Sequence, residues 1–190
     1  SRLPVPFEIC PDKRFICSHE EFNEFLKGRK QPRMEHFYRR IRQSTGLLMD
    51  GKDPVGGKWN FDHDNRKALD RRETPSRPTW PVDAITEEVF ELVNTHFADH
   101  FGELEIDSFQ WPVTRSQALQ IFDHFTKERL ESFGDFQDAM VLGKDTLYHS
   151  LISTSLNLGL LSPLEVCVAA EKAFRNGAAP INAVEGFIRQ

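Results

Sequence analysis

The chain has 190 residues, 39% of them hydrophobic, so it is long enough to bury a core and corresponds to one domain or parts of two. No run approaches the ~18 apolar residues of a membrane helix and no signal peptide is recognisable, so a cytoplasmic protein is expected. The net charge of −5 argues against a chain that binds nucleic acid with its whole surface. Cys10, Cys17 and Cys167 form no CxxC pair, so they are predicted to be free thiols.

The first 44 residues are predicted to form a short strand and two helices. Phe7–Ile9 has the pattern of a short strand. Ser18 and Glu21 have the spacing of a capping box, which predicts a helix that begins at Ser18. The second helix is predicted at Met34–Ile41, where apolar residues recur at positions i, i+3, i+4 and i+7.

Basic residues are concentrated between positions 27 and 42, where the sequence holds seven of them and a single acid, Glu35. Such a run could contact phosphates. The alternative is a solvated helix face that is balanced by acids elsewhere, and the sequence leaves both interpretations open. The basic residues are Lys27, Arg29, Lys30, Arg33, Arg39, Arg40 and Arg42.

The periodicity of apolar residues fails between positions 45 and 82, where glycine and proline alternate with charged residues. This composition predicts an extended linker. Gly56 and Gly57 lack the third glycine and the preceding strand of a dinucleotide-binding fingerprint, so they are assigned to a turn.

From residue 83 onwards the chain is predicted to be mostly helical. Two further capping boxes predict helix starts, one at Thr114 with Gln117 and one at Ser162 with Glu165. Gly134 is expected to end the first of these helical units.

The last helix is predicted to begin near Asn182, and it has no stop signal before Gln190. The first residue is Ser1 rather than Met. The chain is therefore expected to be a fragment of a longer protein.

Hydroxyl side chains are crowded at the start of the last 43 residues, at Ser150, Ser153, Thr154 and Ser155. Because such side chains compete for backbone hydrogen bonds, their concentration indicates a solvent face, a turn or a ligand. At a turn into a helix, hydroxyls and backbone amides can bind an anion such as a pyrophosphate. Ordinary capping and turn chemistry explains the pattern equally well.

Cys10, Cys17, His19 and His36 could in principle ligate zinc, but ordinary core and surface roles are preferred. The spacing of the two cysteines is too long for a zinc motif and no second pair follows, so no metal ligand is predicted. The histidines of the predicted helices are assigned to solvated faces or caps, and no catalytic residue is predicted.

Eight motifs in collinear order make the sequence resemble a known family, the cryptochrome/photolyase superfamily. The similarity is to its bacterial deoxyribodipyrimidine photolyase-related branch, which resembles iron-sulfur (6-4) photolyases. The motifs are Arg33–Arg39, Thr45–Met49, Pro54–Asp62, Trp111–Arg115, Phe133–Met140, Tyr148–Ser153, Leu156–Pro163 and Val184–Gln190.

The resemblance implies an α/β edge followed by a mostly α protein. Residues 1–44 would be the C-terminal part of an α/β, Rossmann-like antenna domain, and residues 45–82 an extended interdomain linker. Residues 83–190 would be the N-terminal part of a helical FAD-binding domain.

The resemblance also implies one wall of a flavin site. Phe136 falls where relatives often have a tyrosine that reaches the flavin phosphates, and phenylalanine lacks the hydroxyl for that bond. The residues that match flavin-contacting positions are His149, Ser150, Leu151, Ile152, Ser153 and Gln190.

The implied activity is light-driven repair of UV-induced pyrimidine photoproducts, of the (6-4) type, by electron transfer from reduced FAD to a lesion in damaged DNA. A monomer is expected, with a 4Fe-4S cluster and an antenna chromophore in the full-length protein but no cluster ligands in this chain. Trp59, Trp80 and Trp111 are too scattered for an electron relay, and the fragment is expected to be inactive and to bind FAD weakly. The alternatives are a cryptochrome-like blue-light receptor and a cofactor-free helical interaction module.

Overall fold

The computed structural model describes residues 5–10, 12–69, 74–103 and 105–190, and within them the fold is mostly helical. Two strands form one small antiparallel sheet, in which Met49 pairs with Pro54. The helices are α1 (His19–Leu26), α2 (Met34–Thr45), α3 (Ala84–His96), α4 (Arg115–Glu128), α5 (Leu130–Phe136), α6 (Ser153–Asn157), α7 (Pro163–Arg175) and α8 (Ile181–Arg189). The shorter elements are β1 (Met49–Asp50), β2 (Asp53–Pro54), and the 3-10 turns η1 (Val55–Gly57), η2 (Asp62–Asp64) and η3 (Ile106–Ser108).

The helix starts predicted from capping boxes are confirmed. At α1 the Glu21 amide donates to Ser18 Oγ over 3.1 Å, and the Ser18 amide donates to the Glu21 carboxylate over 2.8 Å. The same reciprocal pair holds the start of α4, between Thr114 and Gln117. At α7 the Ser162 amide donates to Glu165 over 2.7 Å. Each box satisfies amides that the first turn of a helix leaves without a partner.

Gly134 does not end a helix, so that prediction is wrong. It lies inside α5, where a Cβ atom would come within 2.6 Å of the Ala183 Cα and 2.8 Å of the Ala183 backbone nitrogen. The missing side chain therefore lets the backbones of α5 and α8 approach closely.

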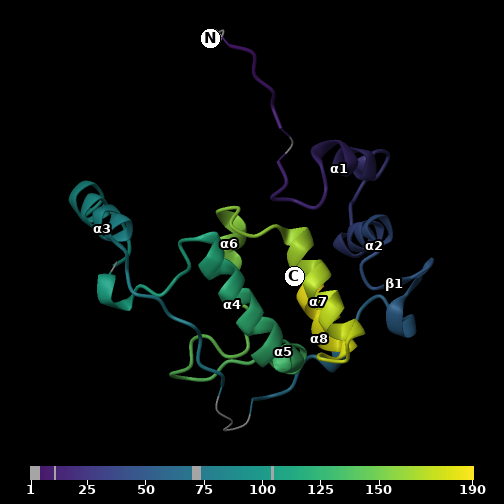
Figure 1. Cartoon of the computed structure of the whole chain (residues 1–190). Coiled ribbons are helices and arrows are strands. Elements are labelled where there is room, and N and C mark those ends of the chain that lie inside the picture. Colours follow the sequence, from purple (N-terminus) through teal and green to yellow (C-terminus); the bar gives the residue numbers. More distant parts are fainter. Residues whose placement is uncertain (1–4, 11, 70–73, 104) are drawn as a thin grey trace.

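The core lies where α4, α5, α7 and α8 pack together, at the centre of the molecule in Figure 1. Phe125 of α4 and Phe133 of α5 meet edge to face with centroids 5.8 Å apart, and Phe187 of α8 packs against both. The hairpin β1–β2 joins this core through Leu48 and Val55, which are buried. These four helices form the scaffold on which the candidate site is built.

The 45–82 segment was predicted to be an extended linker, and the structure gives part of it regular local structure. It holds the hairpin and the turns η1 and η2, and it buries Asn65 completely. Gly56 and Gly57 both have positive φ angles, as the predicted turn requires. Residues 70–73 of this segment lie outside the described part of the chain.

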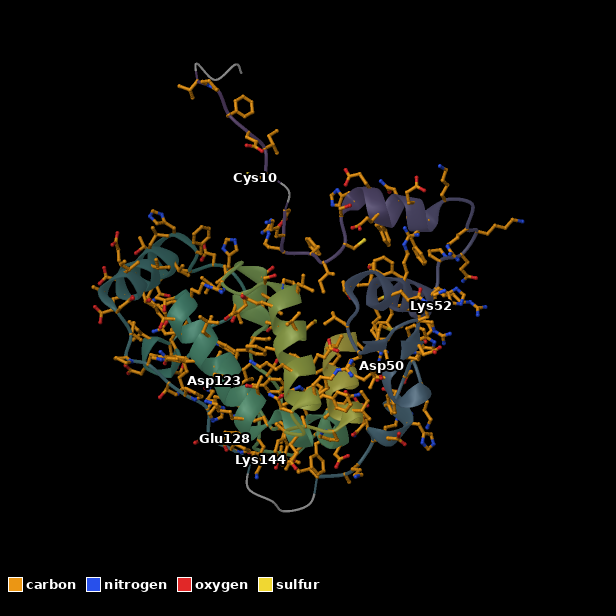
Figure 2. All side chains as sticks on the ribbon, turned by 45° about the vertical axis from the view of Figure 1, so that its right-hand side comes forward. Cys10, Asp50, Lys52, Asp123, Glu128 and Lys144 are labelled. Carbon is orange, nitrogen blue, oxygen red and sulfur yellow. The ribbon has the colours of Figure 1, made fainter. Side chains whose placement is uncertain are left out.

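The strand predicted at Phe7–Ile9 is not formed. These residues are exposed, and Figures 1 and 2 show this part of the chain running away from the helices, with Cys10 at its lower end. A strand needs a hydrogen-bonded neighbour, and no described residue supplies one here.

Candidate functional site

A groove of about 930 Å³ opens between two groups of helices. One wall comes from α1, α2 and the segment before α1, and the other comes from α6, α7 and α8. Its volume falls in the ~300–1,000 Å³ range of pockets that bind small molecules and cofactors. The apolar side chains of the lining are Phe15, Ile16, Phe22, Met34, Phe37, Ile41, Ile152, Leu156, Pro163, Val166, Phe187 and Ile188.

Four of the six residues predicted to contact a cofactor are brought together in this groove. They are Ser150, Ile152, Ser153 and Gln190. The first three precede or open α6, and Gln190 follows α8 directly. Residues 37 or more positions apart in the sequence thus meet at one surface.

The other two predicted residues point elsewhere. His149 lines a different depression, its ring lies edge to face with Phe133 at 6.2 Å, and its carbonyl accepts from Arg129 over 3.1 Å. Leu151 packs against the core and has a φ angle of 60°, in the left-handed region that costs a non-glycine residue about 1–2 kcal/mol. This conformation separates Leu151 from Ser150 and Ile152, which line the groove.

Arg189 brings a positive charge to the rim of the groove, and its charge is held by two carboxylates. Its guanidinium donates to Asp62 Oδ1 over 2.8 Å, and its Nε lies 3.3 Å from Glu185 Oε1. Hydrogen bonds from Arg66 and Arg189 hold the pKa of Asp62 below its usual range. Asp62 of η2 therefore fixes the end of α8 from outside the groove.

A buried pair of residues ties the two walls of the groove together. The Tyr38 hydroxyl of α2 donates to Glu185 Oε1 of α8 over 2.8 Å, and the Phe61 amide donates to Glu185 Oε2 over 3.0 Å. Burial, together with the negative charge of Glu185, raises the pKa of Tyr38, so the phenol stays protonated at neutral pH. The carboxylate of Glu185 is fully buried and its two oxygens are both used.

Two buried hydroxyls near the groove lack partners within the described residues. Thr154 Oγ1 and Ser155 Oγ of α6 make no hydrogen bond there, and Ser155 is fully buried. An unpaired buried hydroxyl costs about 1–3 kcal/mol, so this helix carries more polar groups than its own packing satisfies. Neither hydroxyl lines the groove itself.

Sequence reasoning did not identify several residues of the groove. Arg14 and Cys17 come from the segment before α1, for which the sequence predicts no ligand contact, and Arg189 stands beside the predicted Gln190. Only the position of Arg189, next to a predicted contact, could have suggested its role. Cys17 lies with its thiol 3.3 Å from the Ser18 carbonyl, and burial raises its pKa.

Comparison with known proteins now places the chain in a family. The family model of the deoxyribodipyrimidine photo-lyase-related protein matches residues 1–111. The chain belongs to this family. A protein named (6-4) photolyase from Agrobacterium fabrum is 48% identical over 187 residues, which cover 98% of this chain and 36% of that relative. The chain thus spans about a third of the length of the curated relative it matches.

In this photolyase-related chain, the position predicted to correspond to a tyrosine in relatives is buried. Phe136 stacks on Tyr148 with centroids 5.4 Å apart and is 5% exposed. The three tryptophans contact separate partners: Trp59 lies under Arg39 and Arg42, Trp80 donates to Gln120, and Trp111 lies under Arg77.

No group of three or more His, Cys, Asp or Glu side chains in the described ranges is arranged to hold a metal ion. All three cysteines are free, and Cys167 is buried. None of the helices described is both long enough and apolar enough to cross a membrane.

Proposed function

We propose that this chain forms part of the flavin site in an FAD-dependent, light-driven photolyase that repairs UV-induced pyrimidine photoproducts of the (6-4) type. The observation that carries the proposal is the meeting of Ser150, Ser153 and Gln190 in one groove with a mainly apolar lining. Family membership and the name of the 48% identical relative support it.

The residues of the groove fit the two chemical parts of FAD. Hydroxyls of Ser150 and Ser153 are donors of the kind that bind phosphate oxygens. Arg14 and Arg189 also line the groove, but each is already paired with a carboxylate, Arg14 with Asp12 and Arg189 with Asp62. Phe15, Phe37 and Phe187 offer apolar and aromatic surface to a ring system. Bound reduced FAD would supply the electron that a lesion flipped out of the duplex accepts in light.

The chain's own residues bind and orient in this scheme and move no proton. Gln190 follows the last residue of α8, and the contacts of Glu185 and Arg189 fix that end of the helix against α2 and η2. A fixed amide at this position would orient a bound ring without the flexibility of a loop.

The division into an antenna part (1–44), a linker (45–82) and part of a flavin domain (83–190) belongs to the same proposal. UV-damaged DNA is the proposed partner of the whole protein, with an antenna chromophore and a 4Fe-4S cluster as further cofactors. The absence of cluster ligands from this chain stays a prediction. The monomeric state and the cytoplasmic location stay predictions.

The test replaces Ser150 and Ser153 by alanine together in the whole protein and measures flavin per protein from the visible absorption spectrum. Two hydrogen bonds to a charged phosphate contribute about 1.5–3 kcal/mol each, so flavin affinity should fall about 100-fold or more. The matched control is Ser44→Ala with Ser108→Ala, since both of those hydroxyls bond to carbonyls of their own turns.

Unchanged flavin content in the Ser150 and Ser153 variant would overturn the assignment of the groove. A light-dependent assay for loss of (6-4) photoproducts then tests the reaction. A protein that holds flavin but leaves the photoproducts intact would favour the light-receptor alternative.

A further inference from the structure

Some of the seven basic residues between positions 27 and 42 form ion pairs with acidic side chains, and others do not. Lys27 pairs with Glu24 at 3.5 Å and Arg39 pairs with Glu35 at 2.9 Å. These two side chains are therefore locally compensated.

Arg42 is not available to a ligand at the surface, because the residue is only 1% exposed. Its guanidinium donates to the carbonyls of Leu47, Leu48 and Trp59 and contacts the Tyr38 hydroxyl. The prediction that it could contact phosphates is wrong, because those bonds hold it inside the protein.

Four cations of the run stay exposed and have no carboxylate within 4 Å among the described residues. They form what we call the basic surface: Arg29, Lys30, Arg33 and Arg40. Arg29 also lies over the Phe25 ring at 4.5 Å and donates to the Phe25 carbonyl over 2.7 Å, which orders its guanidinium. The surface belongs to the turn between α1 and α2 and to α2 itself, at the edge of the molecule opposite α3 (Figure 1).

Two of the four cations lie at the start and in the middle of α2. Arg33 is the N-cap residue of α2 and Arg40 follows seven residues later, which is close to two helical turns, so the two residues are about 10 Å apart along the helix axis. His36, also exposed, lies between them. Arginine favours phosphates because its planar guanidinium can bind two oxygens at once.

The basic surface and the groove use different positions of α2. Met34, Phe37, Tyr38 and Ile41 line the groove, and none of the four basic residues does. A polyanion could therefore bind without filling the groove.

We propose that the basic surface binds the phosphate backbone of undamaged duplex DNA, independently of sequence and of any lesion. The choice of DNA among polyanions rests on the proposed function, whereas the surface itself rests on the unneutralised charges. Such a contact holds the protein on intact duplex while it searches, in a chain whose net charge of −5 otherwise opposes binding.

The experiment measures binding of a fluorescent, undamaged 20-bp duplex by anisotropy across a salt titration, in the dark. Each phosphate contact contributes about 0.9 to the slope of log K against log salt, which is roughly eightfold in affinity at 0.1 M. Arg33→Gln with Arg40→Gln should therefore weaken binding about 50-fold and reduce the slope by about 1.8.

The matched control is Lys127→Gln with Lys172→Gln, which removes the same charge from exposed positions on α4 and α7. It should change the slope by less than 0.5. Equal losses in both variants, or wild-type binding by the Arg33 and Arg40 variant, would overturn the proposal. Preferential loss of binding to a polyglutamate probe rather than to the duplex would overturn it as well, because an acidic protein would then be the better partner.

Flavin content and photorepair are recorded on the same preparations, which for all of these measurements are of the whole protein. Duplex binding that depends on the basic surface in a protein without flavin would leave this inference standing and overturn the proposed function. If instead the protein holds flavin and repairs photoproducts, but its duplex binding does not depend on the basic surface, the proposed function would stand and this inference would be overturned.

Discussion

Tyr38 and Glu185 are 147 positions apart in the sequence, yet the phenol donates to the carboxylate over 2.8 Å in the interior. This bond joins α2 to α8, the two helices that carry opposite walls of the groove. A hydrogen bond to a buried charge contributes about 1.5–3 kcal/mol, so the pair should be visible in the stability of the whole protein.

We therefore predict a coupling energy of about 1–3 kcal/mol between the two residues. It is measured by a double-mutant cycle of Tyr38→Phe and Glu185→Gln, with free energies of unfolding from urea denaturation. Tyr38→Phe alone should lower the free energy of unfolding because the Glu185 oxygen loses its donor. Additive effects of the two substitutions would contradict the pairing.

The close approach of α5 and α8 gives a second prediction. Gly134→Ala should lower the free energy of unfolding by about 1–3 kcal/mol, because the new Cβ meets backbone atoms of Ala183 that cannot rotate away. The comparison is Gly186→Ala, whose Cβ would meet the side-chain ends of Asn65 and Gln137 at 2.8 and 2.9 Å.

Those amides can shift, and alanine favours a helix over glycine by about 0.5–1 kcal/mol. Gly186→Ala should therefore cost clearly less than Gly134→Ala. Equal costs would mean that the backbone contact at Ala183 does not limit the packing.

Arg40 and Arg42 are near neighbours with opposite environments, and this gives a third prediction. Arg42→Gln should lower the free energy of unfolding by about 2–4 kcal/mol, because several buried carbonyls lose a charged donor. Arg40→Gln should change it by less than about 0.5 kcal/mol, as is usual for an exposed residue. The difference in the free energy of unfolding is measured by thermal or urea unfolding of the two variants under one condition.

The buried thiol of α7 gives a prediction about pH. Burial raises the pKa of Cys167 from an ordinary value of 9.0 to about 11. Between these values the unfolded chain loses the thiol proton while the folded protein keeps it, so stability that is complete below pH 9 falls as the pH rises. The loss is about 2–3 kcal/mol by pH 11.

Cys167→Ala should remove this part of the decline when free energies of unfolding are compared from pH 8 to pH 11. Cys10→Ala is the control, because Cys10 is exposed and should leave the decline as in the wild type. A steep decline that survives in Cys167→Ala would assign the pH dependence to other groups.

Local chemistry explains which parts of the structure could be predicted from the sequence. The boxes at Ser18, Thr114 and Ser162 use side chains three residues apart, so their spacing alone predicts where α1, α4 and α7 begin. The sequence does not predict the roles of Gly134 and Arg42, because both roles depend on tertiary packing. Gly134 lies against α8, which is far away in the sequence, and Arg42 donates to the carbonyl of Leu48 beside the hairpin.

The residues of the groove, too, could be predicted only in part from the sequence. The crowding of hydroxyls singled out the stretch that contains Ser150 and Ser153, but the sequence does not show that Leu151 adopts a left-handed conformation. That one backbone angle sends neighbouring residues to different sides, so His149 and Leu151 could not be separated from Ser150 beforehand. The wall contributed by Arg14 and Cys17 depends on long-range packing of a segment with no strong local pattern.

The two walls of the groove come from residues 14–41 and 150–190, more than 100 positions apart. A molecule that touches both can bind only after the two ends of the chain have come together, so it binds the native state and not partly folded ones. At a concentration 100 times its dissociation constant, such a ligand would add about 2.7 kcal/mol to the free energy of unfolding. Binding of a ligand in the groove would therefore indicate that the chain has finished folding. It would also protect the chain from proteases that cleave opened forms.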